Sequence, residues 1–149
     1  MNLKNYSSTV PADRSLQLIE KILIDLGASN ISKSINENKK VDGIVFMIAV
    51  NGIPTLFKLK ARVDEVFKRM WKEVSPRTAH KKETKDRVIE QANRTGWKLA
   101  YDRILMDATD IELGNMELME LFLTRAYDMK NNKTLFEKIK ETNFKLLSE

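Results

Sequence analysis

The stretch from Gly43 to Lys60, which reads GIVFMIAVNGIPTLFKLK, decides the fold of this chain. A continuous apolar run from Gly43 to Val50 is followed by Asn51-Gly52, the pair that best accommodates the two positive φ angles of a type I′ turn. The residues after it alternate between apolar and basic side chains, as in a strand with one buried face. The sequence therefore predicts an antiparallel hairpin over residues 43–60. Pro54 predicts that the returning strand lies at a sheet edge, because proline lacks the N–H that a central strand needs.

The residues before the hairpin predict further strands and one helix. Tyr6 to Val10 has the composition of a short strand. Apolar residues then recur at three- and four-residue steps from about Asp13 or Ser15, up to a helix end at Gly27. Ile31 and Ile35 alternate with polar residues, which indicates a half-buried strand. We expect an antiparallel sheet of three or four strands, backed by this first helix.

The second half of the chain predicts helices. One covers about residues 62–72 and stops near Pro76, and the longest covers 82–112. A shorter helix follows Gly114, over about 116–126. The last begins at the capping box of Thr134 and Glu137 and is expected to reach Leu147.

Together these elements define the fold class as α+β, in a single domain over residues 1–149. Residues 1–74 form its α/β part and residues 82–147 its helical part. The chain has 149 residues, of which 42% are hydrophobic, and these suffice for one core. It has no cysteine and no membrane-length apolar segment, and its first residues lack an apolar run of signal-peptide length, so we expect a soluble, cytoplasmic protein.

Residues that commonly carry catalysis are sparse in this sequence. His80 is the sole histidine, and the five glycines are too scattered for a phosphate-binding loop. We therefore expect a protein that is not an enzyme and that uses no metal or cofactor. The alternative is a metal-dependent nuclease built on Asp107, Asp110 and Glu112, although acidic side chains on the outer face of a helix are common.

Basic residues are concentrated in the middle of the chain. The net charge is +4 over residues 58–72, +4 over 74–103 and −5 over 104–128. A basic stripe attracts nucleic acid by releasing counterions from phosphates. The residues expected to face phosphates are Lys58, Lys60, Arg62, Lys81, Lys82, Lys85, Arg87, Arg94 and Lys98. Pairs such as Glu90 and Arg94, one helical turn apart, equally fit a solvated helix face.

Short motifs along the chain resemble an uncharacterised family of small proteins encoded by bacteriophages and prophages, mostly of low-GC Gram-positive hosts. The resemblance rests on Asn5-Tyr6, Val10-Pro11, Arg14-Ser15, Ile19-Glu20, Gly27-Ala28, Phe57-Lys58-Leu59, Gln91-Ala92, Arg94, Trp97-Lys98, Glu120-Leu121-Phe122-Leu123 and Thr134-Leu135-Phe136-Glu137. Thr124 departs from the family, whose members tend to have proline after the Phe-Leu pair. The resemblance implies a mobile-element protein that handles nucleic acid or blocks a host defence system.

Two binding functions follow from these observations. The leading hypothesis is a non-enzymatic accessory protein that binds DNA or RNA through its basic surface. The alternative is an anti-defence protein, similar in action to an anti-CRISPR protein, that binds a host protein through Trp97, Tyr101, Met116 and Met119. We also expect a homodimer, because Ala92, Gly96 and Ala100 form a small-residue stripe that another helix could approach closely.

Overall fold

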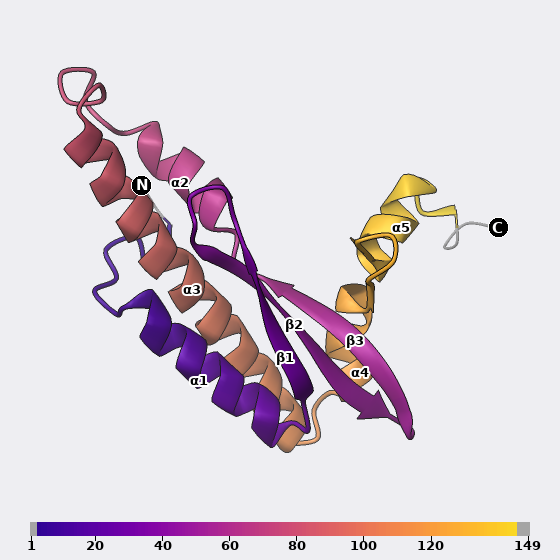
Figure 1. Cartoon of the computed structure of the whole chain (residues 1–149). Coiled ribbons are helices and arrows are strands. Elements are labelled where there is room, and N and C mark those ends of the chain that lie inside the picture. The colour runs from indigo at the N-terminus through magenta and orange to yellow at the C-terminus, as the bar shows by residue number, and fades with distance from the viewer. Residues whose placement is uncertain (1–2, 146–149) are drawn as a thin grey trace.

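The predicted hairpin is the centre of the computed structural model of the chain, which describes residues 3–145 (Figure 1). Strand β2 (Val41–Val50) pairs antiparallel with β3 (Ile53–Lys60). Asn51 and Gly52 connect them with φ angles of 51° and 79°. Both positive angles confirm the predicted turn, and the register that follows places alternate side chains of the two strands on opposite faces.

Strand β1 (Ser29–Ile35) pairs antiparallel with the other side of β2, so the sheet order is β1-β2-β3. This order confirms that Pro54 lies on an edge strand. The predicted strand at Tyr6–Val10 is wrong, since these residues form a turn and an irregular segment. Side chains of the long helix hold this segment instead: Thr95 donates to the carbonyl of Asn5, and Gln91 donates to the carbonyls of Tyr6 and Ser8.

The first three helices lie where the apolar periodicity of the sequence predicts them. Helix α1 (Ala12–Asp25) ends before Gly27, whose φ is 98°, and α2 (Val63–Trp71) follows the hairpin. Helix α3 (Lys82–Glu112) has the predicted bounds and at 1.5 Å per residue is about 46 Å long. Figure 1 shows α1 and α3 side by side along the sheet, with α2 beside the first half of α3.

One face of the sheet is the floor of the hydrophobic core. Ile44, Phe46 and Ile48 of β2 and Phe57 and Leu59 of β3 point to this face and are buried. The residues that cover it come mainly from α1 and α3 and include Leu16, Ile19, Leu23, Trp97 and Ile104. The predicted α+β fold, with a sheet backed by the first helix and a long helix in the second half, is confirmed.

The C-terminal segment begins where α3 ends. After Gly114, with φ 74°, come α4 (Leu118–Phe122), the 3-10 helix η1 (Leu123–Arg125), β4 (Tyr127–Asp128), β5 (Lys133–Thr134) and α5 (Leu135–Glu141). The helix predicted over 116–126 is therefore shorter. The capping box is confirmed, because the Glu137 amide donates to the Thr134 hydroxyl. Helix α5 stops at Glu141, and the predicted end at Leu147 lies outside the described residues.

Three phenylalanines attach the C-terminal segment to the sheet. The Phe122 ring lies edge-on to Phe46 and Phe57, with centroid distances of 6.0 and 5.9 Å, and all three side chains are fully buried. Just after Phe122, Ala126 forms a β-bridge with Phe57. The C-terminal segment therefore runs along the free edge of β3, which protects part of an otherwise open edge.

The small-residue stripe on α3 is used within the chain. A Cβ added at Gly96 would lie 2.7 Å from the Ala61 carbonyl oxygen and 3.1 Å from Val63 Cγ2. Ala92 and Ala100 are also buried. The stripe lets α3 pass close to the start of α2, and it does not form a surface for a second copy. The small-residue stripe therefore no longer supports the predicted homodimer, which stays a prediction.

Replacing Gly96 with alanine tests this close approach. Glycine-to-alanine changes inside helices ordinarily stabilise, but here the new methyl group meets a backbone carbonyl that cannot move alone. We expect Gly96→Ala to lower the free energy of unfolding by about 1–3 kcal/mol in urea titrations. Lys85→Ala, at an exposed position of α3, is the control and should change it by less than about 0.5 kcal/mol. A stabilised Gly96→Ala protein would contradict the packing.

Candidate nucleic-acid interface

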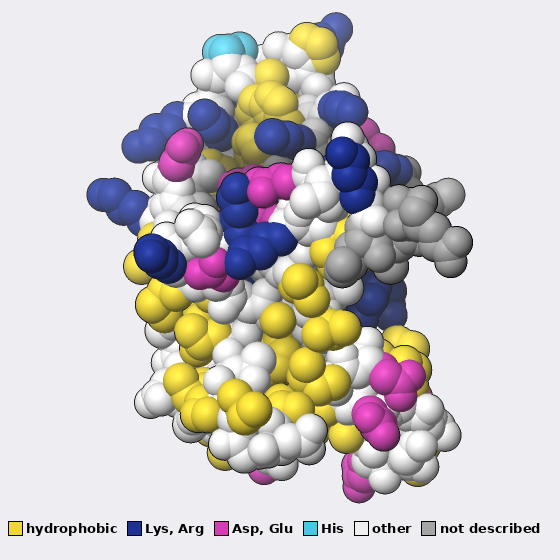
Figure 2. Space-filling model, turned by 90° about the vertical axis from the view of Figure 1, so that its right-hand side faces the viewer, with side chains coloured by type: hydrophobic (Ala, Val, Ile, Leu, Met, Phe, Trp, Pro, Cys, Tyr) yellow, Lys and Arg dark blue, Asp and Glu magenta, His cyan; other side chains and the backbone are white. Residues whose placement is uncertain are grey.

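An open groove of about 790 Å³ lies between the end of β3, the middle of α3 and the C-terminal segment. Seven basic residues line it, against two acidic residues, Asp102 and Glu137. The basic residues are Lys4, Lys58, Lys60, Arg62, Arg103, Arg125 and Lys140. We call this the basic groove. Figure 2 shows Lys and Arg side chains across the middle of one face of the molecule, with a few acidic side chains among them.

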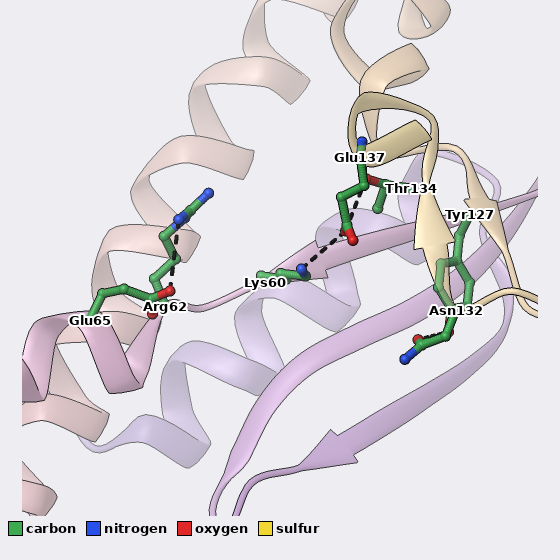
Figure 3. Close-up of polar contacts among 7 residues, drawn as sticks. All are labelled: Lys60, Arg62, Glu65, Tyr127, Asn132, Thr134 and Glu137. Carbon is green, nitrogen blue, oxygen red and sulfur yellow. Dashed lines mark hydrogen bonds and ion pairs between the residues drawn. The ribbon is translucent and has the colours of Figure 1, made fainter. Parts of the chain in front are cut away.

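The β3 side of the groove carries three of the predicted phosphate-facing residues. The Lys58 ammonium lies 5.2 Å from the centre of the Tyr127 ring. Lys60 reaches from β3 toward α5 and pairs with Glu137 at 3.2 Å (Figure 3). Arg62 follows the strand in a left-handed conformation, with φ 47°, and contacts Glu65 at 3.9 Å. The strand end thus directs these three cations into one place.

Helix α3 forms the opposite wall and part of the floor. Gly96, Leu99, Ala100, Arg103 and Met106 all line the groove, and their three- and four-residue spacing places them on one helix face. Gly96 and Ala100 are buried, whereas Arg103 and Met106 are exposed. This wall is therefore apolar at its base and offers a cation and a thioether at its rim.

The C-terminal segment closes the third side. Arg125 pairs with the buried Asp107 of α3 at 3.2 Å, and its guanidinium lies 5.4 Å from the centre of the Phe122 ring. Phe136 and Lys140, one turn apart on α5, also line the groove. The Phe136 side chain is 47% exposed, and Lys140 is exposed.

Acidic groups neutralise some of these cations and leave others free. Lys4 pairs with Asp102 at 3.3 Å, while Lys60, Arg62 and Arg125 have the partners given above. Lys58, Arg103 and Lys140 form no ion pair within residues 3–145. Burial alone would raise the pKa of Asp102, but hydrogen bonds from Asn5, Lys98 and Lys4 outweigh it and lower this pKa. Asp102 therefore stays ionised at neutral pH and keeps Lys98 and Lys4 occupied.

The structure brings together only part of the predicted basic surface. Lys58, Lys60 and Arg62 line the basic groove, whereas Arg94 and Lys98 do not. Arg94 lies about 160° around α3 from Gly96 and donates to Gln91 at 2.6 Å. Lys98 pairs with Asp102 at 3.0 Å and lies 4.8 Å from the Tyr101 ring centre. Arg94 and Lys98 lie four residues apart on one face of α3, but this face does not line the groove, so the predicted stripe and the basic groove are separate surfaces.

The other predicted phosphate-facing residues lie near the start of α3. Lys81, Lys82, Lys85 and Arg87 are exposed and outside the groove. Lys82 precedes Gly96 by about 21 Å along the helix axis. His80 is exposed in the turn before α3. These residues therefore lie at the start of α3, away from the basic groove.

One of the four predicted protein-interaction residues is buried, and the other three are half-buried. Trp97 is completely buried and its indole donates to the Val41 carbonyl at 2.8 Å, so its assignment to a surface is wrong. Met119 packs against the hydrophobic core. Tyr101 and Met116 are half-buried. A tryptophan at heptad spacing serves the core here, and its polar N–H is satisfied by the backbone.

The acidic residues of the nuclease hypothesis do not converge. Asp107 pairs with Arg125, Asp110 accepts a hydrogen bond from Asn115, and Glu112 is exposed. Across residues 3–145 there is no group of three His, Cys, Asp or Glu side chains arranged to hold a metal ion. The nuclease hypothesis therefore gains no support from geometry.

Five groove residues escaped the sequence-based prediction: Lys4, Arg103, Arg125, Phe136 and Lys140. Arg103 carried a usable signal, because it lies seven residues after Gly96 and so on the same helix face. The other four lie far along the chain from β3 and α3, and no local pattern links them to the groove.

No protein family, curated protein or solved structure in the comparisons matches this chain. In the described part of the chain, no helix combines the length and the apolar character required to cross a bilayer.

The Lys60–Glu137 pair can be tested through titration of Glu137. Burial would raise the pKa of Glu137, but the hydrogen bond and charge of Lys60 outweigh it, so this pKa is lowered. The pair stabilises the fold at neutral pH, and this contribution is lost as pH falls through the lowered pKa. Carboxyl-carbon NMR titration should show a higher Glu137 pKa in Lys60→Met. Lys81→Met is the control, and equal values in all three proteins would exclude the pair.

Proposed function

We propose that the protein binds nucleic acid, with phosphates in the basic groove. The observation that carries the proposal is the convergence of seven basic side chains from four separate parts of the chain around one open groove with two acidic residues. Basic side chains that bind phosphates release the counterions held there, and this release favours binding whatever the base sequence. We further propose that it is a non-enzymatic accessory protein of a mobile element, as the family resemblance implies.

The three cations without an acidic partner are the first candidates for phosphate contact. Lys58, Arg103 and Lys140 lie on β3, α3 and α5 respectively, so a strand passing along the groove meets a cation from each wall. Arg103 and Lys140 give up no ion pair when a phosphate binds them, and Lys58 gives up only its contact with the Tyr127 ring. Lys60 and Arg125 have to share or exchange their carboxylates, so we expect them to contribute less.

A double charge reversal in the groove tests the proposal. Arg103→Glu with Lys140→Glu removes two unpaired cations without breaking an ion pair among residues 3–145. We expect affinity for a labelled strand of about 16 nucleotides to fall at least tenfold at about 50 mM salt. The slope of log affinity against log salt should fall by about 1.4 for a single strand, as two phosphate contacts are lost. Fluorescence anisotropy measures both quantities.

The matched control is Lys81→Glu with Lys85→Glu. It makes the same change in net charge at exposed positions outside the groove. We expect a smaller loss of affinity and no comparable change of slope. An equal loss in both double variants would move the interface away from the groove, and a wild-type protein that binds neither single strand nor duplex would contradict the proposal.

Binding to a host defence protein is the second candidate, and it is favoured by apolar exposure around α4. Leu113, Leu123 and Met129 are exposed, and exposed apolar side chains are common in protein interfaces. If this surface binds a partner, Leu123→Asp with Met129→Asp should abolish capture of that partner from nuclease-treated host lysate. Arg103→Glu with Lys140→Glu should retain it. The opposite pattern would assign capture to bridging nucleic acid.

A further inference from the structure

Two exposed cations of the basic groove, Arg103 and Lys140, each lie about one helical turn from an apolar side chain. On α5, Phe136 precedes Lys140 by one turn, and both line the groove. On α3, Arg103 precedes Met106 by three residues, and the Met106 side chain is 65% exposed. Between the walls, Gly96 and Ala100 form a floor without long side chains. A ligand in this groove therefore meets apolar surface as well as charge.

Phe136 is the aromatic residue positioned to use that surface. Its ring is 6.2 Å from the ring of Phe144, which lies outside the groove lining, and the two planes are tilted by 54°. Lys60, Thr134 and Glu137 form hydrogen bonds at the start of α5, which attach the helix to β3 (Figure 3). The phenylalanine is thus presented to the groove from an anchored helix.

A partly exposed phenylalanine close to cations is suited to bind single-stranded nucleic acid, which offers both bases and phosphates. Bases of a single strand have free π-faces that stack on aromatic side chains, while the phosphates contact nearby cations. Bases of a duplex are stacked on each other and reach an aromatic ring only after unstacking, which costs a few kcal/mol. Phosphate contacts alone would not distinguish the two ligands.

We propose that the basic groove selects single-stranded nucleic acid over duplex by stacking a base on Phe136. This inference rests on the proposed function and adds the ligand class to it. Lys140 and Arg103 hold the phosphates on either side of the stacked base. DNA and RNA share this stacking chemistry, so the inference covers single strands of both.

The test compares Phe136→Leu with the wild-type protein on single-stranded DNA, single-stranded RNA and duplex DNA of one sequence. Leucine keeps the apolar bulk at this partly exposed site but removes the π-face. We expect the wild-type protein to bind the single strands more tightly than the duplex. Phe136→Leu should weaken single-strand binding by about tenfold or more and leave duplex binding unchanged. The salt slope should stay the same, because no charge is removed.

Phe136→Tyr and Phe136→Trp are the matched controls, since each keeps an aromatic ring. Both should bind single strands within about threefold of the wild-type protein. Equal affinity for single strand and duplex, or equal losses in the leucine and tyrosine variants, would overturn the stacking inference. If the Arg103 and Lys140 reversals still abolish binding in that case, the proposed function stands. Absence of all binding would overturn both.

Discussion

Burial of one face of the β2–β3 hairpin is the constraint on which the other elements depend. Phe46 and Phe57 are fully buried, and helix α1 alone does not cover both side chains. Trp97 and Ile104 of α3 provide part of that cover, and Phe122 provides the rest. Because Phe122 is held against the hairpin, the chain that follows has to run along the edge of β3. Helix α5 is thereby placed opposite the middle of α3.

The basic groove is a consequence of this arrangement. At its base, Gly96 lets α3 pass close to Ala61 and Val63, so the end of β3 and the middle of α3 meet there. Its third side stays in place because Arg125 pairs with Asp107 and Lys60 pairs with Glu137. These pairs use some of the positive charge for structure. Lys58, Arg103 and Lys140, on three different elements, are the groove cations without an ion pair among residues 3–145.

The difference between the predicted basic surface and the basic groove has one physical origin. A helix turns by about 100° per residue, so basic residues that are close in sequence point in different directions. Arg94 and Lys98 therefore leave the face that Arg103 occupies. Trp97 fits both an interface and a core at the level of sequence, and its burial depends on how closely α3 approaches the sheet. Phe136 shows the converse, since only the folded chain brings it to the same groove as Arg103.

The sequence by itself determined the elements whose stability is local. Asn51-Gly52 specified the hairpin turn, apolar periodicity specified the bounds of α3, and Thr134 with Glu137 specified the start of α5. These features depend on neighbouring residues and on backbone preferences that act over a few positions. Only the tertiary structure decided which charges share the groove, because Lys58, Arg103 and Lys140 are between 37 and 82 positions apart in the sequence. The same packing buried Trp97 and exposed Phe136.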